Sequence, residues 1–429
     1  MRHLVLLLAL TGCTSQNPAA VDPSTTPAAA LTYYQDAAPI LAQRCVGCHS
    51  AGNIAPFTLE SYRDAMTYAS LIKPALVNKL MPPMPPVASG DCPPIDDVRV
   101  MPDSERQRLI AWVDGGAQAG DAAHATPAPP AANALGAPSA VYDSGLDYLS
   151  TYQGSDEYRC FIVDPKLDRA FNLIAIGVRS TNPAIVHHTI VYAAVPQVAA
   201  AVDALEAADP QPGYECFGGP GFAGAFTVGA AAVGSAPRAF PAGSGVPLPA
   251  GTRYVVQVHY NFDNARGANR IAVEAWSAPS LTQVPHGLTA GNYTFDIPAG
   301  ATHVSAAGMG DITLTPVNGA QTRPGNLWGV FPHMHQLGSS IRVDLLRADG
   351  SRQCVVNIQK WDFHWQGEYQ LLQPIKVSAG DRLQTTCVWD NSAGHQPLVG
   401  GVPRQPRDVR FGENSTDEMC LAGVTLTDF

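Results

Sequence analysis

The spacing of hydrophobic and polar positions changes along the chain and indicates two kinds of structure. In the first third, apolar residues recur at helical spacing, and Leu109, Trp112 and Val113 share one helix face. Later the apolar positions alternate, as in residues 254–260 (Tyr-Val-Val-Gln-Val-His-Tyr) and 341–345 (Ile-Arg-Val-Asp-Leu). Alternation of β-branched and aromatic residues with polar ones is typical of strands. We therefore predict a mainly β protein preceded by a small all-α domain.

Two segments are expected to delimit the α domain. Thr32 is placed to cap a first helix that would carry Cys45 and Cys48. Ser104-x-x-Gln107 has the pattern of a capping box and would begin the last helix.

Stretches rich in Pro, Ala, Ser and Thr mark the expected boundaries. Residues 13–31 are predicted to be a flexible tether and residues 120–140 a linker. Between them, residues 32–119 would form the α domain. The rest would form two antiparallel, jelly-roll-like β-sandwiches over residues 141–283 and 284–429.

Composition supports this division and excludes some partners. The chain has 39 Gly and 37 Pro, which disfavours long helices and coiled coils. Its 26 Lys and Arg against 36 Asp and Glu give a net charge of −10, which argues against nucleic acid as a partner.

The N-terminus has the features of an export signal. Arg2 is followed by an apolar run from Leu4 to Leu10, too short for a membrane span of about 20 residues. The string Leu10-Thr11-Gly12-Cys13 resembles a bacterial lipobox. We expect residues 1–12 to be a lipoprotein signal peptide and Cys13 to be lipidated; the alternative is an ordinary secretory signal. The protein would then be anchored to a bacterial membrane by lipid alone, facing the periplasm or the cell surface.

Cysteine number fits an oxidising compartment. There are nine cysteines, and removing Cys13 and the pair Cys45/Cys48 leaves six. An even remainder suggests three disulfides, although six cysteines allow about fifteen pairings.

The string Cys45-Val46-Gly47-Cys48-His49 is the C-x-x-C-H signature of covalently bound c-type haem. The alternatives are a redox-active cysteine pair or half of a zinc site. His49 would bind the iron, and a methionine or histidine would be the sixth ligand. The Pro-rich loop at 79–86 offers Met81, which we prefer, and Met84.

This region resembles small c-type cytochrome domains. The matching strings are Ile54-Ala55-Pro56-Phe57, Met81-Pro82-Pro83 and Ala111-Trp112-Val113-Asp114, and the resemblance covers most of residues 32–119.

Five histidines form candidate metal ligands in the β region. His333 and His335 are two apart, so they would share one face of a strand and could chelate one ion. His187 and His188 are adjacent and would point to opposite faces of a regular strand. Binding one ion together with His259 would need a β-bulge or a strand end. For each histidine alone, a packed or surface imidazole is the competing interpretation.

Taken in order, these strings resemble the copper type II, ascorbate-dependent monooxygenases, over about residues 150–425. They are His187-His188, Gln257-Val258-His259-Tyr260, His333-Met334-His335 and Thr416-Asp417-Glu418-Met419-Cys420. The resemblance implies two copper ions. His187, His188 and His259 would hold an electron-transfer copper. His333, His335 and Met419 would hold the copper at which oxygen reacts, and a thioether there favours Cu(I).

Disulfide pairing follows from the same resemblance. Cys387–Cys420 would fix the loop that carries Met419, and Cys160–Cys216 would lie in the first sandwich. Cys92–Cys354 is the pair that remains.

The chain departs from the peptidylglycine branch of that family. The Arg two positions before the His-x-His motif, which helps to hold a substrate carboxylate, is Phe331 here. The Tyr four residues after the methionine ligand is Gly423. The expected copper ligands are present, whereas the Arg and the Tyr of the peptidylglycine branch are absent. This combination predicts the same reaction on a different substrate.

The resemblances together imply an exported copper-dependent monooxygenase that hydroxylates a C–H bond of a small organic or peptide-like substrate with O2. Its electrons would come from an ascorbate-type reductant or a redox protein, relayed by the fused haem c. The alternative is a periplasmic haem and copper protein for electron transfer or copper handling, without oxygenase activity.

Overall fold

The computed structural model describes residues 30–87, 90–97, 99–128, 135–154, 156–232, 237–262, 265–311, 325–399, 402–412 and 414–428. The chain divides into residues Met1–Ala30 and a compact unit, Leu31–Phe429. The predicted signal peptide, Cys13 and most of the tether lie outside the described residues. Among the described helices, none combines the length and the apolar character that a membrane crossing requires.

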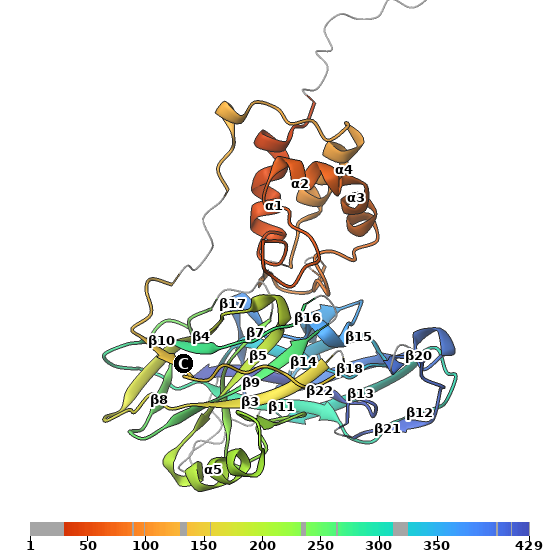
Figure 1. Cartoon of the computed structure of the whole chain (residues 1–429). Coiled ribbons are helices and arrows are strands. Elements are labelled where there is room, and N and C mark those ends of the chain that lie inside the picture. Colours follow the sequence, from red (N-terminus) through yellow and green to blue (C-terminus); the bar gives the residue numbers. More distant parts are fainter. Residues whose placement is uncertain are drawn as a thin grey trace, which may run out of the picture. The chain divides into compact units, whose positions relative to one another are not determined.

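The predicted α region is helical (Figure 1). Its elements in the described part of the chain are the π-helical turn η1 (Tyr33–Ala37), α1 (Ala38–Arg44), α2 (Tyr62–Thr67), α3 (Ala69–Val77) and α4 (Asp103–Asp114). A short 3-10 turn, η2 (Ala122–His124), follows α4 in the sequence. They pack around a core that includes Leu41, Leu109 and Trp112.

Two local predictions in this region are wrong. α1 ends at Arg44, so Cys45 and Cys48 lie on the turn after the helix. That turn still contains a helical hydrogen bond, since the His49 N–H donates to the Cys45 carbonyl at 2.8 Å. α4 begins at Asp103 and makes no side-chain cap, because Ser104 already lies inside the helix.

The first β-sandwich is formed by two antiparallel sheets, with described strands in the orders β2-β10-β4-β8 and β6-β3-β9-β5-β7. Side chains from both sheets, such as Leu173, Val256 and Val273, share one core. The strands are β2 (Ala140–Asp143), β3 (Asp156–Val163), β4 (Phe171–Ser180), β5 (Val186–Ala194), β6 (Tyr214–Glu215), β7 (Phe226–Ala232), β8 (Val246–Leu248), β9 (Arg253–Asn261) and β10 (Ile271–Ser277). The helical elements here are η3 (Pro183–Ile185), η4 (Pro196–Val198) and α5 (Ala199–Ala208).

The second β-sandwich also has two main antiparallel sheets among the described residues, in the orders β1-β17-β14-β22-β11 and β13-β18-β15-β16. Val330, Ile341 and Leu383 come from the two sheets and pack in one core. The strands are β1 (Ile95–Asp96), β11 (His286–Asn292), β13 (Val304–Asp311), β14 (Gly325–His333), β15 (Gly338–Leu346), β16 (Arg352–Ile358), β17 (Tyr369–Val377), β18 (Arg382–Trp389) and β22 (Cys420–Asp428). The short pairs are β12 (Asp296–Ile297) with β21 (Val409–Arg410) and β19 (Leu398–Val399) with β20 (Val402–Pro403), and the 3-10 turns are η5 (Phe363–Trp365) and η6 (Ala393–His395).

The segment between α3 and α4 joins the helical region to the second sandwich. Its β1 pairs with β17, with Ile95 opposite Leu371. Met84 and Ile95 are buried in the second sandwich's core. The predicted α domain, residues 32–119, is therefore not self-contained, because part of it belongs to the β-sheet next to it.

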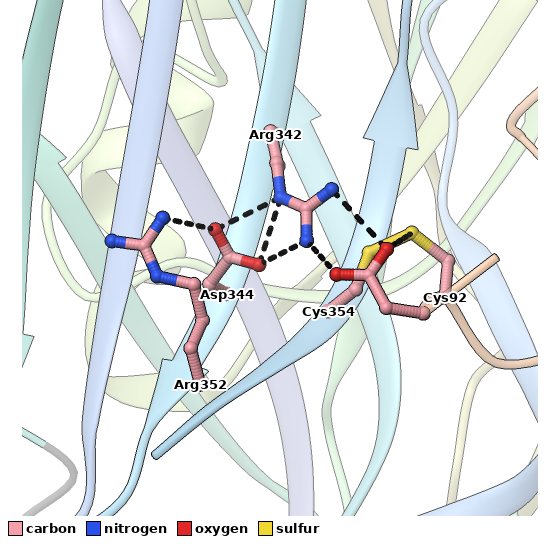
Figure 2. Close-up of a disulfide and its surroundings, with 6 residues drawn as sticks. Cys92, Arg342, Asp344, Arg352 and Cys354 are labelled. Atoms are coloured by element: carbon pink, nitrogen blue, oxygen red, sulfur yellow. Dashed lines mark hydrogen bonds and ion pairs between the residues drawn. A yellow bond between two sulfur atoms is a disulfide. The ribbon is translucent and has the colours of Figure 1, made fainter. Parts of the chain in front are cut away.

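Disulfides are present at all three predicted pairs: Cys92–Cys354, Cys160–Cys216 and Cys387–Cys420. Figure 2 shows Cys92–Cys354 beside the Arg342 guanidinium, which reaches the buried Asp344 carboxylate at 2.8 Å. Arg342 also pairs with Asp91, next to Cys92. Covalent and ionic links thus hold the same stretch of chain. Three disulfides indicate an exported protein.

Candidate metal centres

Three histidines from two neighbouring strands of the first sandwich form one cluster. β5 and β9 pair with His188 opposite His259, and the register shifts between Val186 and His188. His187 is therefore the additional residue of a β-bulge. The bulge removes the alternation that would have sent His187 and His188 to opposite faces.

The ring nitrogens of this cluster face one another. His188 Nδ1 lies 3.4 Å from His187 Nδ1 and 3.3 Å from His259 Nδ1. Candidate ligand atoms from the three residues all lie within 4.8 Å of one another. Two nitrogens bound to one ion at about 2.0–2.1 Å, with a near-tetrahedral angle, would lie roughly 3.3 Å apart. The spacing therefore fits three imidazoles that share one metal ion.

The surroundings of the cluster keep its imidazoles neutral and oriented. Burial lowers the pKa of His187 to about 3 and that of His188 well below its usual value, with the neighbouring imidazoles adding to the effect. His259 Nε2 lies 2.9 Å from Asp156 Oδ1, so Nε2 carries the proton and Nδ1 is left to bind a metal. Its ring also stacks on Tyr158, with centroids 4.2 Å apart.

A second pair of histidines lies where β14 ends. His333 is the last residue of β14, and the rings of His333 and His335 are 5.1 Å apart. His333 Nδ1 donates to Gln366 Oε1 at 2.5 Å, and His335 Nδ1 donates to the Asp417 carbonyl at 3.3 Å. Both rings therefore use Nδ1 for a protein partner and leave Nε2 for a metal. Burial lowers the pKa of His335 to about 4, helped by His333.

Met419 follows the residues that hold His335. Strands β14 and β22 pair His333 with Leu421, two residues after Met419. Glu418, fully buried, accepts the N–H groups of His335 at 2.9 Å and Leu337 at 2.6 Å and the Trp389 indole N–H at 2.9 Å. The Cys387–Cys420 disulfide fixes the other side of Met419.

The cysteine motif lines a cavity of about 490 Å³. Cys45 and Cys48 carry thiols outside the three disulfides, and burial raises the pKa of Cys45 to about 12 and of Cys48 to about 11. His49 Nδ1 donates to the Phe57 carbonyl at 3.0 Å, so Nε2 is the ring nitrogen that remains to bind a metal.

The two methionines of the Pro-rich loop have different surroundings. Met81 lines the same cavity as Cys45 and Cys48. Met84 is buried in the second sandwich's core, where its sulfur accepts the Asp362 N–H at 3.4 Å. The geometry therefore favours Met81 over Met84 as the methionine facing the cavity.

Sequence reasoning missed several partners of these residues. Asp156, Gln366 and Trp365 contact His259, His333 and His187, and no motif marks them. The His364 ring also lies near the first cluster, 6.1 Å from the ring of His187.

Gln257, two residues before His259 in β9, donates to the Cys216 carbonyl at 2.7 Å, so it supports the disulfide region rather than the cluster.

Two histidine clusters with oriented, neutral imidazoles are typical of a metal-binding protein. Residues 289–425 match the family model of the copper type II ascorbate-dependent monooxygenase C-terminal domain. The matched range is less than half of the chain and includes His333, His335 and Met419. This part of the protein is therefore similar to a domain of copper-binding oxidoreductases that use O2 and an organic substrate.

Solved structures give weaker likenesses. A protein from Eubacterium rectale described as secreted is 10% identical, with 66% of this chain and 73% of that chain covered and a TM-score of 0.21. A β-porphyranase of glycoside hydrolase family 86 from Bacteroides plebeius is 9% identical, with 65% and 36% covered and a TM-score of 0.18. At these TM-scores neither likeness supports an interpretation.

Proposed function

We propose that this protein is an exported copper-dependent monooxygenase that hydroxylates a C–H bond of a small organic or peptide-like substrate with O2. The main support is the convergence of His187, His188 and His259 from two strands, with His188 Nδ1 3.4 Å from His187 Nδ1 and 3.3 Å from His259 Nδ1. The family match over residues 289–425, a range that includes His333, His335 and Met419, supports a second copper centre there.

The two clusters would have different tasks. His187, His188 and His259 would hold a copper that transfers electrons, and His333, His335 and Met419 would hold the copper that meets O2. Copper bound there would supply one-electron redox chemistry, and the Met419 thioether would favour its reduced state. Asp156, Gln366 and the Asp417 carbonyl keep the protons of the three rings they contact on the nitrogens that face the protein.

The lining of the cysteine-motif cavity by Cys45, Cys48, His49 and Met81 supports a c-type haem as its occupant. Cys45 and Cys48 would supply the thioether links, His49 Nε2 one axial ligand and Met81 the other. Such a group would accept and pass on single electrons. We propose that residues 32–119 carry this haem, that residues 141–283 and 284–429 carry one copper each, and that lipidated Cys13 anchors the chain to the membrane.

Phe331 and Gly423 suggest which substrates are excluded. The two residues are directly paired across β14 and β22, on the same face of the sheet as His333. An aromatic ring opposite a glycine offers no charge for a substrate carboxylate. We therefore propose a substrate that lacks the terminal carboxylate of a peptide.

Replacement of Met419 by leucine tests the assignment of the oxygen site. Met419→Leu should lose one copper per chain and coupled O2 uptake, while the haem spectrum and the other copper remain. Met334→Leu is the matched control, because Met334 lies between His333 and His335 but is buried in the core. Coupled O2 uptake that survives in Met419→Leu would refute the assignment. Redox cycling of the unaltered protein that no substrate affects would favour the electron-transfer or copper-handling alternative.

A further inference from the structure

The turn Asp362–Gln366, which contains η5, contacts both histidine clusters. At one end, Gln366 Oε1 accepts from His333 Nδ1 at 2.5 Å. The Phe363 ring lies 5.9 Å from the His335 ring. Gln366 and Phe363 of this turn therefore contact the second histidine cluster.

Trp365 of the same turn contacts the first cluster and the cysteine-motif cavity. Its ring lies 5.2 Å from the His187 ring. Trp365 and His187 both line the cavity of about 490 Å³ that Cys45, Cys48 and His49 line. The Trp365 indole therefore borders the cavity proposed for the haem, and it also lies next to His187, a predicted copper ligand.

Polar contacts from the 97–99 segment hold Trp365 in place. Arg99 Nη1 donates to the Trp365 carbonyl at 2.8 Å. Arg99 is buried, pairs with Asp97 at 2.8 Å and lies over the Tyr369 ring at 4.6 Å. A buried guanidinium with these partners fixes the backbone of the turn.

We propose that Trp365 is the side chain through which electrons pass from a haem in the cysteine-motif cavity to the copper at His187, His188 and His259. With both groups bound, the step would move one electron: a ferrous haem would become ferric and a cupric ion cuprous, and no bond or proton would change. Electron tunnelling weakens steeply across empty space, so a packed aromatic side chain between donor and acceptor raises its rate. The inference rests on the proposed function, which supplies the haem and the copper.

The test measures electron transfer within the full-length, haem- and copper-loaded protein, without substrate or O2. The haem is reduced by a light pulse, and its reoxidation is followed in its visible absorption. Trp365→Leu should slow reoxidation by about tenfold or more, equivalent to about 1.36 kcal/mol in activation free energy. Trp365→Phe should keep most of the rate. Phe262→Leu is the control, because Phe262 is an aromatic residue of the first sandwich's core that does not line the cavity, and it should leave the rate unchanged.

The outcomes separate this inference from the proposed function. A Trp365→Leu rate equal to that of the unaltered protein would overturn the inference. So would a slow rate accompanied by a changed cupric electron paramagnetic resonance spectrum, because Trp365 would then only orient His187. An unaltered protein that binds no haem or no copper would instead contradict the proposed function.

Discussion

At the scale of single residues, the candidate site depends on which nitrogen of each histidine is occupied by the protein. His333, His335 and His49 direct Nδ1 to an oxygen and leave Nε2, whereas His259 directs Nε2 to Asp156 and leaves Nδ1. Motifs in a sequence specify that a histidine is present but not its tautomer. Asp156, 103 residues before His259, is brought to it only by the pairing of β3 with β9.

Asp156 should therefore influence copper binding without being a ligand. Asp156→Asn removes the charged acceptor of the His259 N–H and should weaken copper binding at the three-histidine cluster by about 10–100-fold. Competition with a copper chelator measures this affinity. Asp164→Asn is the control, because Asp164 forms an exposed ion pair with Lys166, and this variant should leave the copper affinity unchanged. Equal affinity in both variants would contradict a role for Asp156.

At the scale of elements, the strands could be predicted, and a β-bulge or a strand end at His187-His188 was named as the condition for a shared ion, but the sequence could not show which of the two occurs. Alternation of residues correctly indicated β9 and β15. The bulge at His187 depends on how β5 pairs with β9, which the local sequence does not encode. The Cys45–Cys48 turn shows the same limit, since α1 ends at Arg44 and not beyond the motif.

Close packing of two strands offers a test of the second sandwich. A Cβ at Gly308 in β13 would lie 2.0 Å from the Gly291 carbonyl carbon in β11, whereas one at Gly287 in β11 would meet nothing within 4 Å. Gly308→Ala should therefore lower the free energy of unfolding by about 3 kcal/mol, since backbone cannot move aside cheaply. Gly287→Ala should leave it nearly unchanged. Thermal unfolding measures both, and similar transition temperatures would contradict this packing.

At the scale of the whole molecule, the helical region and the second sandwich share chain segments. Met84 illustrates why this was unpredictable: its sequence context matches that of Met81, yet it is buried with residues more than 200 positions away. The Cys92–Cys354 disulfide spans 262 residues and was expected only as the remaining pair.

Removing that disulfide should loosen this segment without unfolding the clusters. The double variant Cys92→Ser with Cys354→Ser should lose about 2–4 kcal/mol of stability. Proteolysis should then become faster next to Cys92, because the covalent link to Cys354 is lost and the neighbouring chain is held by non-covalent contacts such as the β1 pairing and the ion pair of Asp91 with Arg342. Removing Cys160–Cys216 in the same way is the control and should not expose this segment. Unchanged cleavage there would show that the disulfide does not hold it.

The central claim, that six side chains form two distinct copper centres, is tested most directly by anomalous diffraction at the copper absorption edge from copper-loaded crystals. The account predicts two peaks in each chain. One should lie among His187, His188 and His259, and the other among His333, His335 and Met419. A single peak, or a second peak remote from the Met419 sulfur, would contradict it.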